Sequence, residues 1–256
     1  MDIKLFNFSN FSKCVAFFLF FIIILILLII PFTFINYKQF LLLIKNLRFI
    51  RAIIFGLITS ITATIISGII SIPIGYYLSR KKGYFEKVID TVFEIPLIVP
   101  PLIIGAMLLI FFNLTLFNFI FTIQGAIIGQ FFVSFPYSLK ATKNAFELIP
   151  VNYEEIAMTL GATPLRSFFD TTFKLSLNGI ITGLILSWIR SFGEFGATLL
   201  IGGGIAGKTE NIPVFIYMVI SEGDFKKGLS ASLLIIIFGI FMLIFLKNLV
   251  KSKKLG

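Results

Sequence analysis

The sequence contains no histidine and only one cysteine, Cys14, among its 256 residues. A metal site built on imidazole or thiolate ligands is therefore not expected, and one cysteine cannot form a disulfide framework. The chain also lacks the clustered nucleophiles and bases that a membrane enzyme would need. We predict no catalytic residue, no metal ligand and no cofactor bound by this chain.

Charged residues are scarce, at 13% of the chain, whereas 58% of the residues are apolar and 33 are phenylalanine. A soluble domain has roughly 25% charged residues. The composition therefore predicts an all-α integral membrane protein in a lipid bilayer. The net charge of +10 could indicate a nucleic-acid partner, but the lysines and arginines flank apolar runs, as orientation in a membrane requires. We predict no nucleic-acid binding.

Long runs with few or no charges predict about six transmembrane helices in a single domain, 1–256, because about 20 apolar residues cross a bilayer. The predicted spans are 14–37, 52–79, 95–112, 119–139, 178–201 and 228–246. The first run follows a basic start, as a signal peptide does, but its length and the lack of an A-x-A cleavage pattern favour a span. Residues 38–51 have the spacing of an interfacial helix.

The distribution of lysine and arginine predicts the orientation. With the N-terminus inside, the inner segments carry more of these residues than the outer ones, although the basic segment 38–51 opposes this arrangement. We expect a multi-pass protein of the cell membrane, with both termini and the polar loop 147–177 in the cytoplasm.

This polar loop has the local signals of two short helices joined by a glycine. Asn152 is predicted to cap the first helix, with Glu155 three residues later as in a capping box. One face of that helix carries Tyr153, Ile156, Ala157 and Leu160. Gly161 ends it, and Thr163 followed by Pro164 starts the second helix. An amphipathic helix in an ordinary loop is the alternative.

The loop resembles the EAA loop of ABC importer permeases, E-A-A-x-x-x-G, in which this chain has Ile156 at the first alanine. It also has Phe-Lys at 173–174 and Leu-Asn at 177–178 where relatives often have Leu-Pro, so the path into the next span is not predicted by the resemblance. In that family the loop docks on a separate ATPase. The residues that the resemblance assigns to this coupling are Glu154, Glu155, Ile156, Ala157, Leu160, Gly161 and Ala162.

The predicted span 178–201 is the only one with full charges inside it, Arg190 and Glu194. Ionisable groups at membrane depth normally pair, and the i, i+4 spacing makes these two partners. They belong to the run W-I-R-S-F-G-E-F-G-A-T-L, which is similar to the R-x-x-G-E-F-G-A-T signature of molybdate, tungstate and sulfate permeases. Two roles remain open: a group in the transport pathway or gate, and a pair that only locks helix packing.

Pro100 and Pro101, with Pro96 just before them, interrupt the start of the span 95–112. Broken backbone at membrane depth survives where it is buried in protein or lines a cavity. The prolines therefore either line the pathway or form a kink that packs.

Residues 202–209, G-G-G-I-A-G-K-T, match the phosphate-loop pattern G-x-x-x-x-G-K-T. That motif needs a buried strand before it and a helix after it. Here a membrane span precedes it, Pro213 follows it, and the predicted orientation places it outside the cell. We interpret it as a flexible outer turn; relatives in the oxyanion permease family carry a similar G-K-T turn.

The resemblances imply a type I ABC importer permease for an oxyanion, most closely molybdate or tungstate, with sulfate or thiosulfate as the alternative. They imply a homodimer, two copies of an ATPase subunit that hold ATP and Mg, and an extracytoplasmic substrate-binding protein. An ion-coupled secondary transporter would need intramembrane charges, for which only Arg190 and Glu194 qualify. A membrane scaffold would not need the loop 147–177.

Overall fold

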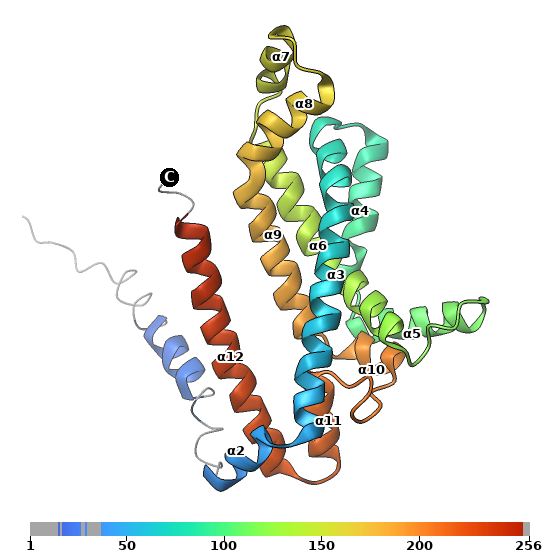
Figure 1. Cartoon of the computed structure of the whole chain (residues 1–256), viewed down its shortest axis with the longest axis vertical. Helices are drawn as coiled ribbons and strands as arrows, with labels where there is room; N and C mark the ends of the chain where they lie inside the picture. Colours follow the sequence, from blue (N-terminus) through green and yellow to red (C-terminus); the bar gives the residue numbers. More distant parts are fainter. Residues whose placement is uncertain (1–14, 16, 27–28, 30–36, 253–256) are drawn as a thin grey trace, which may run out of the picture.

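The computed structural model describes residues 15, 17–26, 29 and 37–252, and within them the chain forms helices and turns without a strand (Figure 1). The predicted all-α membrane class is confirmed. The elements are α2 (Tyr37–Ile44), α3 (Leu47–Arg80), α4 (Tyr84–Ile98), α5 (Pro101–Asn113), α6 (Ile123–Glu147), α7 (Asn152–Thr159), α8 (Pro164–Phe168), the π-helical turn η1 (Phe169–Phe173), α9 (Lys174–Phe192), α10 (Gly196–Gly202), α11 (Ile212–Ser221) and α12 (Phe225–Ser252).

Three helices, α3, α6 and α9, pack side by side at the centre of the molecule (Figure 1). Small residues let their backbones approach. A Cβ added to Gly183 would lie 2.8 Å from Ala141 Cβ, and one on Gly75 would lie 3.1 Å from a backbone nitrogen of α6. The hydroxyls of Ser71 and Ser138 lie 2.8 Å apart. Small residues and buried hydroxyls are typical of helix contacts within membranes.

Helix α3 has 34 residues and begins where the Asn46 side chain accepts a hydrogen bond from the Phe49 amide. At about 1.5 Å per residue it is long enough to cross a bilayer, and it contains the predicted span 52–79. Its outward face over the middle of the helix carries Ile54, Ile58, Ile61, Ile65 and Ile69. An isoleucine face of this kind suits contact with lipid.

Three helices of the described part are long and apolar enough to cross a membrane: α3, the continuous helix Pro164–Phe192, and Phe225–Met242 within α12. The bent pair α4–α5 makes a fourth if it counts as one span. Helix α6 has 25 residues but carries buried glutamine and serine side chains. The predicted span 14–37 is described only in part. Its apolar helix Phe17–Ile26 belongs to the described residues, whereas residues 14, 16, 27–28 and 30–36 lie outside them.

The predicted span 95–112 does not form one helix. Helix α4 ends at Ile98, α5 begins at Pro101, and the two are bent by 108°. Proline lacks an amide hydrogen and disfavours a helical conformation in the residue before it, so the Pro100–Pro101 pair forces the break. Figure 1 shows α5 projecting sideways from the bundle.

The predicted span 178–201 is also broken. Helix α9 ends at Phe192 and the short α10 begins at Gly196. A Cβ on Gly196 would lie 2.7 Å from the Leu102 backbone nitrogen, and one on Gly105 would lie 2.8 Å from Ala197 Cα. The two breaks therefore pack against each other, which apolar patterns along the sequence do not indicate.

Helix α6 is displaced from the predicted span 119–139. It starts at Ile123, where the Thr122 hydroxyl caps the first turn, and it continues to Glu147. Its charged last turns remain helical because α4 supplies partners: Lys143 Nζ lies 2.6 Å from Asp90 Oδ2. The predicted loop 147–177 therefore begins at the end of a helix.

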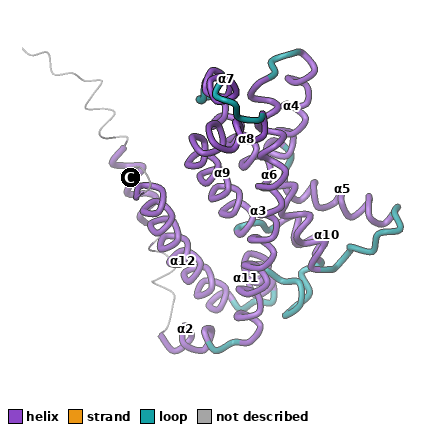
Figure 2. Tube along the Cα trace, turned by 45° about the horizontal axis from the view of Figure 1, so that its top comes forward, coloured by secondary structure: helices purple, strands orange, loops and turns teal. Residues whose placement is uncertain are grey.

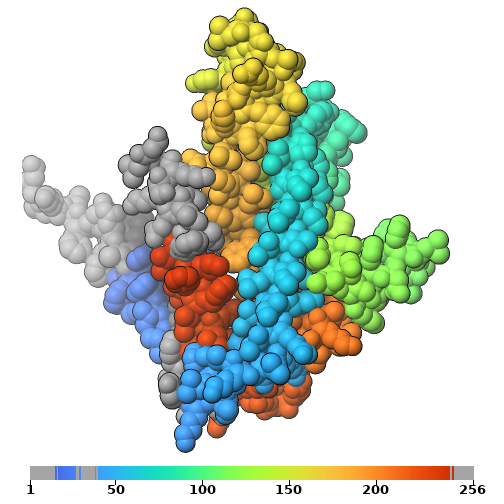
Figure 3. Space-filling view, in the orientation of Figure 1, coloured from blue at the N-terminus to red at the C-terminus, as the bar shows by residue number. Residues whose placement is uncertain are grey.

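The two ends of the bundle carry different elements (Figures 1 and 2). Helices α7 and α8 lie at one end, and α2 and α11 lie at the other. The space-filling view shows the α7–α8 region as a protrusion beyond the packed helices (Figure 3). This protrusion is the first candidate functional site.

Candidate functional sites

Helix α7 ends in a turn that is defined by its hydrogen bonds. Gly161 has φ of 93°, its amide donates to the Met158 carbonyl at 3.0 Å, and the Ala162 amide donates to the Ala157 carbonyl at 3.0 Å. This is a Schellman motif, in which a left-handed glycine closes a helix. Residues 160–163, here named the elbow, then lead into α8.

The start of α8 is as predicted. The Thr163 hydroxyl accepts a hydrogen bond from the Arg166 amide, and Pro164 occupies the first helical position. Because both signals are local, they set the direction of the chain after Gly161 without help from the rest of the fold.

The predicted capping box at the start of α7 is wrong. The N-cap residue is Val151, Asn152 is the first helical residue, and no side chain caps the helix. The first amides instead reach backbone carbonyls of the preceding turn: Tyr153 N donates to Pro150 O, and Glu154 N donates to Val151 O. These contacts already use the Tyr153 and Glu154 amide hydrogens, to which a side-chain cap would bind.

The elbow and α7 present apolar side chains to solvent. Leu160 is 83% exposed, and Ile156 is 58% exposed. Glu155 and Gly161 are exposed, and Ala157 is half-buried. A protruding apolar surface with a polar rim is typical of a protein interaction site.

Glu154 is placed differently, because its side chain is buried against its own chain. Its Oε1 lies 3.0 Å from Arg80 Nη2 and accepts a hydrogen bond from the Thr172 hydroxyl. The Tyr76 hydroxyl donates to Oε2 at 2.6 Å. Burial opposes ionisation, but the hydrogen bonds from Thr172, Tyr76 and Arg80 outweigh it and lower the pKa of the Glu154 carboxyl.

Tyr76, Arg80, Glu154 and Thr172 form a group that we name the anchor. Arg80 Nη1 also donates to the Ile149 carbonyl at 2.8 Å, and the Tyr76 ring packs on Phe168. The anchor thus ties α3 to the end of α6, to α7 and to η1. Arg80 directly follows the predicted span 52–79, and its partner Glu154 lies 74 residues away, so no local pattern joins the two.

The path from the elbow into the bundle runs through a π-helical turn. Residues Pro164 to Phe192 form one continuous helix, with η1 between α8 and α9. A single π turn inserts an extra residue without ending a helix. The chain therefore enters α9 through this turn without a break in the helix.

Arg190 and Glu194 are in contact across the end of α9, as their spacing predicted. Arg190 Nη1 lies 2.7 Å from Glu194 Oε2, and the Glu194 side chain is 1% exposed. Glu194 Oε1 also accepts a hydrogen bond from the Ala197 amide at 2.9 Å, and Asn211 Nδ2 donates to the Glu194 carbonyl. The carboxylate thus caps α10 while it neutralises Arg190.

Pro100 and Pro101 lie at the break before α5, which packs against the start of α10. Pro100 is the N-cap of α5, Pro101 is its first residue, and Gly196 packs against the backbone of Pro101 and Leu102. The fold therefore brings Pro101 against Gly196, two residues after Glu194, although Pro101 and Gly196 are 95 residues apart in the sequence.

Residues 202–209 do not form a phosphate loop. Helix α10 precedes them in place of a strand, and the next helix, α11, begins only at Ile212 with Asn211 as its cap. The following residue, Glu210, is buried and paired with Arg48 at 2.8 Å. The Thr209 hydroxyl accepts from the Ile205 amide and so holds the turn closed.

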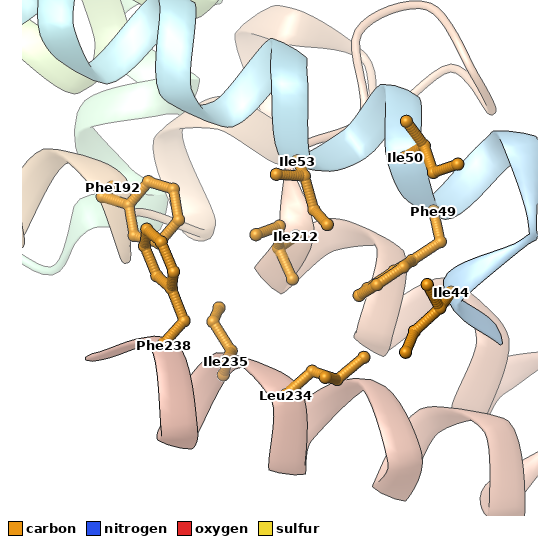
Figure 4. Close-up of a pocket in the computed structure, with 9 residues that line it drawn as sticks. All are labelled: Ile44, Phe49, Ile50, Ile53, Phe192, Ile212, Leu234, Ile235 and Phe238. Carbon is orange, nitrogen blue, oxygen red and sulfur yellow. The ribbon is translucent and has the colours of Figure 1, made fainter. Parts of the chain in front are cut away.

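An apolar hollow of 440 Å³ lies between α3 and α12 (Figure 4). Its lining residues are Ile44, Phe49, Ile50, Ile53, Phe192, Ile212, Leu234, Ile235 and Phe238. A cavity without polar groups cannot replace the hydration of an anion. It is therefore not a site for a charged solute.

These features define a multi-pass helical membrane protein with broken spans that pack on one another and an anchored apolar elbow at one end. The chain belongs to the family of binding-protein-dependent transport system inner membrane components, whose pattern matches residues 71–254. The resemblance to importer permeases is confirmed at this level.

Relatives with assigned names match most of the chain. It is 34% identical over 221 residues to the molybdenum transport system permease protein ModB of Haemophilus influenzae, covering 81% of this chain and 96% of that one. It is 28% identical to the molybdate/tungstate transport system permease protein WtpB of Pyrococcus abyssi, covering 84% and 87%.

Among solved structures, the fold is similar to a bacterial ABC transporter involved in the import of the acidic polysaccharide alginate. The TM-score is 0.78 at 16% identity, over 96% of each chain. At this identity the likeness concerns the fold.

Proposed function

We propose that this chain is the permease subunit of an ATP-driven importer of molybdate or tungstate. The observation that carries the transport role is the anchored elbow, an apolar surface held at the end of the bundle by a buried ion pair. In this proposal two copies of the chain form the membrane unit. Two ATPase subunits bind ATP and Mg, and an extracytoplasmic protein delivers the substrate, in keeping with the family's description.

The residues of α7 and the elbow that the resemblance assigns to coupling divide into two roles in this proposal. Those that dock on the ATPase are Glu155, Ile156, Ala157, Leu160, Gly161 and Ala162. Glu154 instead positions the docking surface, because its carboxylate is buried in the anchor. When ATP binding closes the ATPases, the elbows move together, and the anchor passes this movement to α3, so that the path opens outward.

The proposed orientation places the elbow in the cytoplasm. Helix α12 starts near α2 and α11 and runs toward the end that carries α7, which agrees with a cytoplasmic C-terminus (Figure 1). The turn 202–209 would then lie outside.

We expect Lys208→Ala to leave uptake and ATP hydrolysis within about twofold of the wild type, since Lys208 is exposed and holds no phosphate. In a Cys14→Ser background, Lys208→Cys should react with a membrane-impermeant maleimide added outside intact cells. Labelling only from the cytoplasmic side would contradict the orientation.

The substrate is proposed from the names of the relatives and from the R-S-F-G-E-F-G-A-T run. Uptake of labelled tungstate, in cells that carry the permease with its ATPase and binding protein, should fall more than tenfold with excess molybdate and little with sulfate. Discrimination of this size needs a closed set of hydrogen-bond donors, which a soluble binding protein can supply. Sulfate uptake that excess tungstate and molybdate leave unchanged would favour the sulfate alternative.

A further inference from the structure

The central helices expose different side chains at one depth of the bundle. Ser71 of α3 contacts Ser138 of α6, and Gly183 of α9 packs on the same turn of α6. Side chains next to these residues therefore lie at the same height along the axis of the helix bundle. At this level α3 exposes Ile69, which is 67% exposed, whereas α9 exposes Thr182.

The exposed edge where α6 meets α9 is polar over several turns. We name this edge the seam. It consists of Tyr137, Lys140 and Asn144 from α6 with Asn178 and Thr182 from α9, all exposed or half-exposed. Polar side chains at membrane depth are costly against lipid and normally face protein or water. Thr182 lies at the level of Ile69 in the isoleucine face of α3, so the contrast at this level indicates that the seam does not face lipid there.

The seam is also hollowed. One hollow of 450 Å³ joins Asn144, Asn178 and Thr182 with apolar neighbours such as Leu148 and Leu175. Another of 260 Å³ joins Tyr137, Lys140 and Asn144 with Leu97 and Leu186. Both are lined by Asn144, so they adjoin along the edge of the two helices. Each has room for several water molecules, at about 30 Å³ per molecule.

Several seam groups have hydrogen-bonding capacity to spare. Within the described part of the chain, the side chains of Tyr137, Asn144 and Asn178 make no hydrogen bond to protein. The Thr182 hydroxyl donates to the Asn178 carbonyl at 2.7 Å and can still accept. Lys140 Nζ lies 2.8 Å from Glu94 Oε1, so its charge is balanced. The Tyr137 hydroxyl and the side-chain amides of Asn144 and Asn178 are neutral donors, which can hydrate a passing anion without trapping it as an unpaired cation would. The Thr182 hydroxyl, whose hydrogen is already donated, can accept a hydrogen bond from water.

We propose that the seam is one wall of the water-filled path through which the anion crosses, with its neutral donors replacing part of the anion's hydration shell. A second copy of the chain would supply the facing wall. The inference rests on the proposed function for the charge of the solute, while the presence of water along the seam follows from the chemistry of its side chains.

The test uses single cysteines in a Cys14→Ser background, in the complete complex with its ATPase. A charged methanethiosulfonate reagent reacts with the thiolate, which forms in water and not in hydrocarbon. We expect Thr182→Cys and Asn144→Cys to react at least tenfold faster than Ile69→Cys, the exposed control at the level of Thr182. Equal, slow labelling of Thr182→Cys and Ile69→Cys would show that the seam is dry and would overturn the proposal.

This outcome is separable from the substrate assignment. Labelling measures water along the seam and does not depend on which anion is carried, whereas competition between tungstate and sulfate measures the substrate. If the seam cysteines react fast and the protein carries sulfate, the results support the path and contradict the molybdate proposal. If the seam cysteines react slowly and the protein carries tungstate, the results contradict the path and agree with the proposed function.

Discussion

Gly161→Pro is expected to reduce substrate uptake at least tenfold and to release the ATPase, while the protein still inserts in the membrane. Gly161 has φ of 93° and donates its amide hydrogen to Met158. Proline fixes φ near −65° and has no amide hydrogen, so it removes the turn at a local cost of about 3 kcal/mol or more. Uptake assays and copurification of the ATPase measure the two effects.

A matched control residue, Gly223, lies at the end of the bundle opposite the elbow. Gly223 closes α11 with the same motif: φ is 88°, its amide donates to Ile220 O, and Asp224 N donates to Val219 O. A Cβ would meet nothing within 4 Å at either glycine. Gly223→Pro should therefore perturb the backbone equally and leave the ATPase bound.

A second variant tests the docking surface without changing the backbone. Glu155→Arg reverses an exposed charge on α7 and should also weaken ATPase association. Normal uptake by both Gly161→Pro and Glu155→Arg would refute the coupling role of the elbow. Equal loss of the ATPase from Gly161→Pro and Gly223→Pro would show a general folding defect instead.

Arg190→Met is expected to be the most damaging single change in the broken span 178–201. It leaves Glu194, 1% exposed, without its counter-ion, and removing one partner of a buried ion pair costs about 3–5 kcal/mol. Glu194→Gln should be milder, since Arg190 is 27% exposed and the amide oxygen of glutamine can still accept from Ala197.

The double variant Arg190→Met/Glu194→Gln removes the orphan charge and keeps the cap on α10, so it should be more stable than Arg190→Met alone. The yield and thermal stability of the purified complex measure this, and uptake is then compared at equal amounts of folded protein. Since the carboxylate joins α9 to α10, we expect a structural pair and uptake within about tenfold of the wild type. A double variant that folds but does not transport would instead assign Arg190 to the pathway. A double variant that is no more stable than Arg190→Met would show that the ion pair does not contribute the expected free energy to folding.

Much of the fold could be predicted because its signals are local. Apolar runs bounded by charges gave the positions of α3 and α12, and Thr163, Pro164 and Gly161 gave the elbow. The capping box at Asn152 failed because Pro150 and Val151 supply backbone acceptors that a search for side-chain caps does not consider. The predictions of continuous helices over 95–112 and 178–201 were wrong at Pro100 and at Gly193, because the apolar pattern continues there although the backbone turns.

The sequence by itself determined the membrane class, the elbow and the spacing of Arg190 and Glu194, because hydrophobicity, capping and i, i+4 contacts depend on residues close together in the chain. Only the tertiary structure decided that the Glu154 carboxylate is buried in the anchor, that the two helix breaks pack together, and that polar edges of α6 and α9 adjoin. Each of these joins residues tens of positions apart. Their partners are selected by helix packing, which no local pattern encodes.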